Sequence, residues 1–221
     1  MYNTHVPPIC AAMRSSPELF TRGVMFAVLS ARTHFTSVPD QMADLDRRGD
    51  ASRHLFSWKV DTYRHLADPE TRKPSQACHN LWREVCASNS TEESLRLLTA
   101  VPGLGIAKAA FVLQFMGHDI ACLDSRNAAR ENKDPARYNG HGRKGTPYFD
   151  RKIEQYVREF GGRAQELWDA WCEEVASVYG MPAEDISRLH LDTIVPPNYL
   201  VPKGRESCVV PFIGGSQDVP F

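Results

Sequence analysis

The sequence predicts an all-α protein. Apolar residues recur at spacings of three and four along most of the chain, which is the period of an amphipathic helix. Helix-start signals precede two of these stretches, at Ser16-Pro17 and at Ser90–Glu93. No stretch alternates apolar and polar residues as a half-buried strand would. We therefore expect helices and turns throughout.

The chain has 221 residues, of which 42% are hydrophobic and 24% are charged, which suits one globular unit. No apolar run reaches the roughly 20 residues needed to cross a bilayer, and the N-terminus lacks the features of a signal peptide. We expect a cytoplasmic protein without a membrane partner. The net charge of -1 is mild evidence against a nucleic-acid ligand, although local clusters of Lys and Arg matter more than the total.

The first half of the chain predicts an irregular leader followed by helices. Residues 1–15, with their proline pair, are expected to be irregular. Ser16 would cap a buried helix over 17–35, with Pro17 at its first position. Two more helices are expected over 39–48 and 51–66.

The second half continues in the same way, with one polar interruption. Helices are predicted over 76–87, from the capping box Ser90–Glu93 to Ala100, and over 106–117. After the polar, basic stretch 126–152, which reads as a functional or solvated loop, helices are expected over 147–160, 164–179 and 183–190. The tail 196–221 is rich in proline and glycine, so we expect it to follow the surface without regular secondary structure.

Six cysteines are scattered along the chain without a C-x-x-C pair or a nearby histidine at zinc-ligand spacing. We predict reduced, mostly buried thiols and no metal ligands. The compact cysteine group that would hold an iron–sulfur cluster is also missing from the sequence, so no such cluster is expected.

The strongest motif is the turn Val101-Pro-Gly-Leu-Gly105 between two predicted helices. Gly103 and Gly105 have no Cβ to block a close approach, and the backbone N–H groups at the start of the next helix suit a phosphate oxygen. A monovalent cation could bridge the turn carbonyls to that phosphate. The alternative is a plain corner whose glycines only permit close helix packing.

The register around this turn resembles the helix-hairpin-helix DNA glycosylase superfamily. The segment reads VPGLGIAKAAFVLQFMGHDIACLDSRNAAR, and upstream VLSARTHFTSV resembles the end of the superfamily's first conserved helix. The resemblance covers about 17–130 and implies DNA as partner and two helical lobes with a cleft between them. Residues 16–35 with the C-terminal helices would form one lobe, and about 39–130 the helix-hairpin-helix lobe.

Two departures from the superfamily pattern affect the expected chemistry. Ala107 stands where lyase-type members have a nucleophilic lysine, and Lys108 follows one residue later, which turns it about 100° around a helix. Arg32 replaces the glutamine that usually fills the gap left by an extruded base. Lyase activity through a Schiff base is therefore not expected.

The segment PGLGxxKAAFVLQ…ACLDSRN is more similar to a phage family than to repair glycosylases. This family is the alpha-glutamyl/putrescinyl thymine pyrophosphorylases, which are amino acid:DNA transferases of thymidine hypermodification. The resemblance implies a viral enzyme that acts inside the infected host cell. Such an enzyme would replace pyrophosphate on activated 5-hydroxymethyluracil in DNA with an amine from an amino acid or a polyamine.

This resemblance assigns provisional roles to residues. Asp124, Lys108 and Asn127 are the catalytic candidates; a fixed carboxylate would stabilise positive charge or accept a proton from the incoming ammonium. The alternatives are that Asp124 only caps SRNAAR and that the Lys108 stem only covers apolar surface. Pyrophosphate or the DNA backbone would meet the basic residues Arg126, Arg130, His141, Arg143 and Lys144, unless these form a solvated loop.

The end of the first conserved helix supplies the expected contacts to the duplex. Arg32, Thr33 and His34 would hold the base out of the stack, or else are a polar helix end. His190 and Asp192 are more typical of a structural helix end, and we leave them outside the expected site.

Three functions stay open on the sequence alone. The first is the transferase, the second a monofunctional DNA glycosylase that uses Asp124 to excise a modified or damaged base, and the third a non-enzymatic module that only holds DNA. The transferase would break the bond between the 5-methylene and its substituent, whereas the glycosylase would break the glycosidic bond.

Overall fold

The computed structural model describes residues 1–31, 33–138 and 145–197, and its secondary structure confirms the all-α prediction. Within these ranges no β-strand is present, and two isolated bridges join Ala67 to Pro74 and Ile120 to Gly161. The α-helices are α1 (Tyr2–Ser15), α2 (Pro17–Leu29), α3 (Val38–Arg48), α4 (Trp58–Leu66), α5 (Gln76–Ala87), α6 (Thr91–Ala100), α7 (Ile106–Phe115), α8 (Ser125–Arg130), α9 (Pro147–Phe160), α10 (Ala164–Tyr179) and α11 (Ala183–Ile194). Short 3-10 turns are η1 (Phe35–Ser37), η2 (Gly49–Ala51) and η3 (Pro135–Arg137).

The leader expected to be irregular is helical, so that prediction was wrong. Pro7 and Pro8 lie inside α1, where each lacks the N–H that would complete a helical hydrogen bond. The helix forms because Tyr2, Val6, Ile9 and Met13 lie at spacings of three and four and are all buried. Burial of four large side chains offsets the cost of the proline pair.

Two predicted helices are shorter than expected. The helix predicted over 17–35 ends at Leu29, and the one predicted over 51–66 begins at Trp58. The buried side chain of Lys59 explains the first boundary, because its Nζ donates to the carbonyls of Leu29 at 3.4 Å and Ala31 at 3.2 Å. These contacts satisfy backbone acceptors that the end of a helix leaves open.

The stretch 126–152 was expected to be a loop, but α8 occupies its first residues, because Asp124 caps the segment. Other predicted boundaries agree closely with the structure. Ser16 Oγ accepts from the N–H groups of Glu18 and Leu19 and so caps α2. Ser90 Oγ likewise accepts from the Glu93 N–H, whereas the Glu93 carboxylate accepts from Ser88 instead of completing a reciprocal capping box. The bounds of α5, α9 and α10 match the prediction, and α11 extends four residues further, to Ile194.

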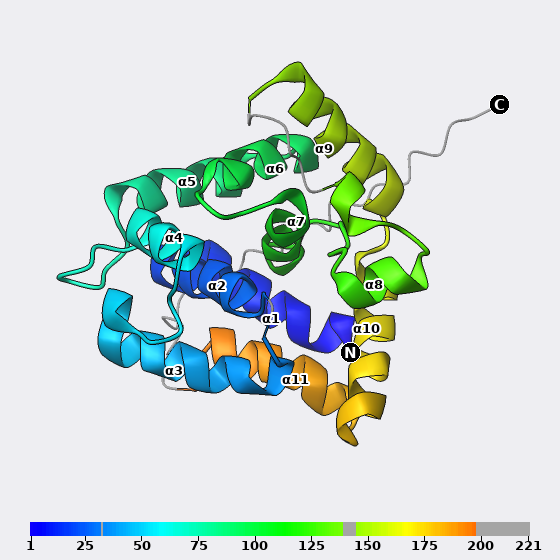
Figure 1. Ribbon diagram of the computed structural model, residues 1–221, viewed down its shortest axis with the longest axis horizontal. Helices are drawn as coiled ribbons and strands as arrows, with labels where there is room; N and C mark the ends of the chain where they lie inside the picture. Colours follow the sequence, from blue (N-terminus) through cyan, green and yellow to red (C-terminus); the bar gives the residue numbers. More distant parts are fainter. Residues whose placement is uncertain (32, 139–144, 198–221) are drawn as a thin grey trace.

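Helix α7 lies near the centre of the molecule (Figure 1) and contacts α1, α2 and α6. It is apolar on nearly every side, as expected of a helix surrounded by others. Helices α1, α10 and α11 pack together on one side, and α6 contacts α5, α7 and α9 on the other. One continuous hydrophobic core joins both sides. The division into two lobes with a cleft stays a prediction.

The extended link from α7 to α8 is fixed by one fully buried side chain. The hydroxyl of Tyr156, on α9, donates to the Ala121 carbonyl at 2.9 Å and accepts from the Leu123 N–H at 2.8 Å. Asp124 follows directly. Among the described residues, no helix is long and apolar enough to cross a membrane.

Candidate active site

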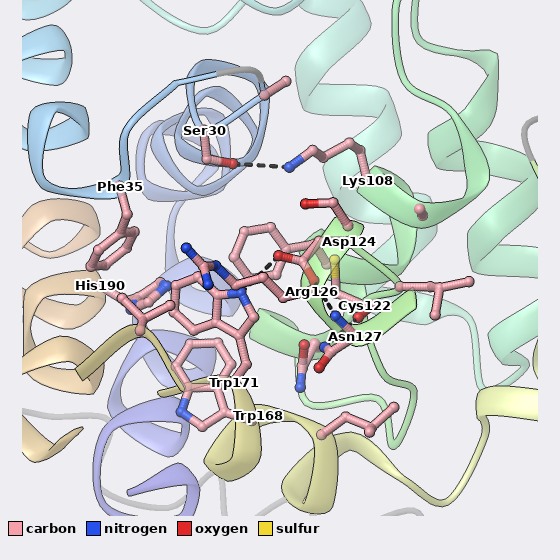
Figure 2. A pocket seen from close by; sticks show the side chains of 18 of the residues that line it. Ser30, Phe35, Lys108, Cys122, Asp124, Arg126, Asn127, Trp168, Trp171 and His190 are labelled. Carbon is pink, nitrogen blue, oxygen red and sulfur yellow. Dashed lines mark hydrogen bonds between the residues drawn. The ribbon is translucent and has the colours of Figure 1, made fainter. Parts of the chain in front are cut away.

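A cavity of about 550 Å³ lies where the end of α2, the segment before η1 and helices α7, α8, α10 and α11 meet. Figure 2 shows its two sides: Phe35, His190, Trp168 and Trp171 lie on one, and Lys108, Cys122, Asp124 and Asn127 on the other. Its volume is in the range of small-molecule sites, which are about 300–1,000 Å³. The cavity therefore has an aromatic wall and a polar one, which meet where Trp171 contacts Asp124.

Asp124 is held at the cavity by two hydrogen bonds, one to each carboxylate oxygen. Oδ1 accepts from the Asn127 N–H at 2.9 Å, which makes Asp124 the N-cap of α8. Oδ2 accepts from the indole Nε1–H of Trp171 at 2.7 Å. The capping alternative thus holds, and it coexists with a position in the cavity wall.

Lys108, the third residue of α7, also lines the cavity. Its Nζ donates to Ser30 Oγ at 3.0 Å and lies 5.5 Å from the centre of the Phe111 ring. Figure 2 shows this side chain reaching from α7 towards the end of α2. As far as the described part of the chain goes, two of the three ammonium hydrogens remain for a ligand.

Asn127 lies beside these groups, 4% exposed, with one side-chain atom unpartnered. Its Nδ2 donates to the Cys122 carbonyl at 2.8 Å, whereas no described group donates to the buried Oδ1. Burial raises the pKa of the neighbouring Cys122 thiol to about 12, so this sulfur stays protonated at neutral pH. Cys122 is therefore a poor nucleophile here.

The two described arginines of the predicted pyrophosphate site share one partner. Arg126 lines the cavity and pairs with Glu174 through contacts of 2.8 Å, and Arg130 contacts the same carboxylate at 3.4 Å. Arg130 also donates to the Ala170 carbonyl and does not line the cavity. Both charges are thus partly compensated by protein. The candidates His141, Arg143 and Lys144 lie outside the described residues.

The segment after α2 forms part of the cavity lining. Thr33 and His34 line the cavity, and His34 Nδ1 lies 3.4 Å from the Tyr179 hydroxyl. Arg32 lies outside the described residues. The buried Lys59 clamps the preceding carbonyls, and its pKa is lowered by burial and then by the charge of Lys108. Lys59 was missed in the sequence because nothing around it suggests burial.

The glycine turn lies apart from the cavity on the surface. Gly103 has a φ of +79° and packs so tightly against α4 that an added Cβ would lie 2.4 Å from the Trp58 ring. Thr62 fixes the turn by donating to the Pro102 carbonyl at 2.6 Å. No acceptor within the described chain meets the N–H groups of the exposed Gly103 and Gly105.

The aromatic wall is the part of the site that sequence reasoning missed. His190, set aside in the sequence as structural, lies at its centre and lines the cavity. Its ring is surrounded by the aromatic side chains of Phe26, Phe35, Phe111, Phe115, Trp168 and Trp171. These rings come from α2, η1, α7 and α10, and no local pattern connects them.

The described cysteines are free thiols, and Cys208 lies outside the described residues. Within the ranges that the structure describes, no group of three His, Cys, Asp or Glu side chains could hold a metal ion. Comparison with protein-family models, with curated proteins and with solved structures found no match to this chain.

Proposed function

We propose that the protein modifies a pyrimidine base in DNA, replacing pyrophosphate on activated 5-hydroxymethyluracil with the amine of an amino acid or a polyamine. The observation that carries the proposal is the cavity itself, where the Asp124 carboxylate and the Lys108 ammonium belong to one wall and face aromatic rings. An extruded base can stack on the aromatic side while its substituent meets the charged side.

The reaction needs a carboxylate and a cation in distinct roles. The C–O bond between the exocyclic methylene and pyrophosphate breaks, and the leaving group departs with the electron pair. A C–N bond forms from the amine lone pair, and the ammonium proton that must be lost passes to the Asp124 carboxylate. Lys108 would stabilise the negative charge that develops on the departing pyrophosphate.

The glycine turn supports DNA as the macromolecule that carries the base. The exposed N–H groups of Gly103 and Gly105 meet no acceptor within the described residues and lie at the start of α7, where the helix dipole favours an anion. Phe56, 60% exposed, precedes by two residues the Trp58 that packs against the turn, and it can stack on bases. The monovalent cation at the turn stays a prediction.

The test is a reaction with DNA that contains pyrophosphorylated 5-hydroxymethyluracil and a mixture of amino acids and polyamines, followed by digestion to nucleosides and mass spectrometry. We expect one new nucleoside, whose mass identifies the amine. Release of free base with abasic sites would instead identify a glycosylase, because Asp124 would equally stabilise an oxocarbenium-like sugar. Unchanged DNA that nevertheless binds the protein would favour the non-enzymatic module.

A further inference from the structure

His190 carries a hydrogen-bond acceptor that the protein does not use. The side chain is 1% exposed, and its Nδ1 lies 3.0 Å from the Ile186 carbonyl. Because a carbonyl only accepts, Nδ1 must carry the hydrogen, and Nε2 is left with a lone pair. Among the described residues no donor meets Nε2, although His190 lines the cavity.

The surroundings of His190 restrict the kind of ligand that fits beside it. The centres of the Trp168, Phe35 and Trp171 rings lie 4.6, 4.7 and 5.5 Å from the imidazole centre. Burial among these rings lowers the pKa of His190 to about 3, so the imidazole is neutral at physiological pH. An environment that rejects a proton on His190 also disfavours an ammonium group next to it. The ligand at this wall is therefore neutral, flat and able to donate an N–H.

We propose that Nε2 of His190 accepts a hydrogen bond from the ring N–H of a thymine- or uracil-type base held in this cavity. These bases offer one ring N–H between two carbonyls, whereas cytosine presents a lone pair at the same ring position and would be repelled. His190 is thus a specificity-determining residue. The inference rests on the proposed function for its assumption that the ligand is a base of DNA.

The test observes His190 directly in the full chain, labelled with ¹⁵N-histidine, by NMR. The probes are 1-methylthymine, 1,3-dimethylthymine, which lacks the ring N–H, and 1-methylcytosine; the methyl group on N1 stands for the sugar. We expect a saturable change in the Nε2 chemical shift with 1-methylthymine and none with the other two. Equal shifts with all three probes, or no saturable shift with 1-methylthymine, would overturn the proposal.

A substitution separates recognition from packing. In H190F an aromatic ring remains among the aromatic neighbours, and the Ile186 carbonyl keeps its helical partner, but the acceptor is lost. We expect about tenfold weaker binding of 1-methylthymine, observed by tryptophan fluorescence, because one hydrogen bond is worth about 1 kcal/mol or slightly more. The matched control is H118F, which removes another buried histidine, one whose partner is Thr91 and which lies outside the cavity wall.

The outcomes of this test and of the transferase assay are independent. A selective shift at His190 without amine transfer would leave base recognition intact and overturn the transferase. If the protein transfers the amine but its H190F variant still prefers 1-methylthymine over 1,3-dimethylthymine, the transferase proposal stands and the role of His190 is overturned. H190F that binds as tightly as the natural chain would also remove His190 from the recognition of the base.

Discussion

The cavity and the glycine turn are built in opposite ways, although α7 contributes to both. In the cavity, polar side chains are mostly paired: both oxygens of Asp124 accept hydrogen bonds, and Lys108 contacts Ser30. At the turn, the exposed N–H groups of Gly103 and Gly105 lack acceptors within the described chain. The cavity offers side-chain groups to a ligand, whereas the turn offers backbone N–H groups.

This difference suggests a division of tasks. Side chains fixed by neighbours in a half-enclosed space can distinguish one ligand from another and align reacting atoms. Backbone donors on a surface suit a repeated group such as a phosphate, which positions DNA without reading its sequence. We therefore expect changes in the cavity to alter chemistry and base preference, and changes at the turn to alter stability and DNA affinity.

Replacement of Asp124 by Asn separates the two regions most strongly. Asn keeps one oxygen to cap α8, so the fold and DNA affinity should persist, although its amide nitrogen cannot accept from Trp171 as Oδ2 does. Loss of the carboxylate should slow amine transfer about 100-fold or more. The rate is measured by nucleoside mass spectrometry and the affinity by fluorescence anisotropy. The matched control is D134N, since Asp134 also caps a turn, η3, but lies outside the cavity wall. Equal rates for both variants would remove Asp124 from catalysis.

At the turn, Gly103→Ala should act on stability. The backbone at φ +79° costs an alanine about 1 kcal/mol, and the new Cβ would collide with Trp58, so we expect a loss of roughly 2–3 kcal/mol in the free energy of unfolding. Urea titration measures it. Gly162→Ala is the matched control, because Gly162 has a φ of +75° but nothing within 4 Å of the added Cβ. The difference between the two variants isolates the contact with α4, and no difference would argue against it.

The prediction of Asp124 shows what the sequence could and could not supply. The register of the hairpin segment assigned Asp124, Lys108 and Asn127, and all three line one cavity with Thr33 and His34. They come together because they lie within one short segment or at a helix end whose spacing is regular, and their roles stay predictions. The aromatic wall could not be found, since Phe35, Trp171 and His190 meet only after α10 and α11 fold back on α2 and α7.

The helices show the same limit. Cap residues such as Ser16 and Ser90 act on their own neighbours and so are visible in the sequence. The end of α2 depends on Lys59, 30 residues from Leu29 along the chain, and α1 depends on burial that outweighs its prolines. A helix boundary that depends on a residue far away in the chain cannot be predicted from the neighbouring sequence.

Trp171→Phe tests whether pairing matters inside the cavity. The ring would still pack edge-on against Phe35, but Asp124 would lose one of its two hydrogen bonds. We expect kcat to fall about tenfold with little change in KM, because the carboxylate is less well oriented. Trp168→Phe is the control, since the indole of Trp168 donates to Ser187 instead. An equal fall in both variants would mean that indole packing, not the contact with Asp124, matters.

The buried histidines are expected to make stability depend on pH. Burial lowers the pKa of His190 to about 3 and that of His118 to about 4, whereas both titrate near 6.5 when unfolded. The unfolded chain therefore binds more protons below about pH 6.5, and stability falls as the pH drops from there towards 4. Urea titrations at pH 7.5 and 5.5 measure the loss. H190F should reduce it, and an unchanged loss would place the effect elsewhere.

The hydroxyl of Tyr156 has a consequence for how this chain can change over generations. In the core around it, phenylalanine would fill nearly the same space. Replacement of Tyr156 by phenylalanine would leave the Leu123 N–H and the Ala121 carbonyl without this hydrogen-bond partner, and both belong to the link that leads to Asp124. Substitution at position 156 is thus constrained by a segment more than 30 residues away. The same residue supports both the fold and the placement of Asp124, so the two cannot change separately.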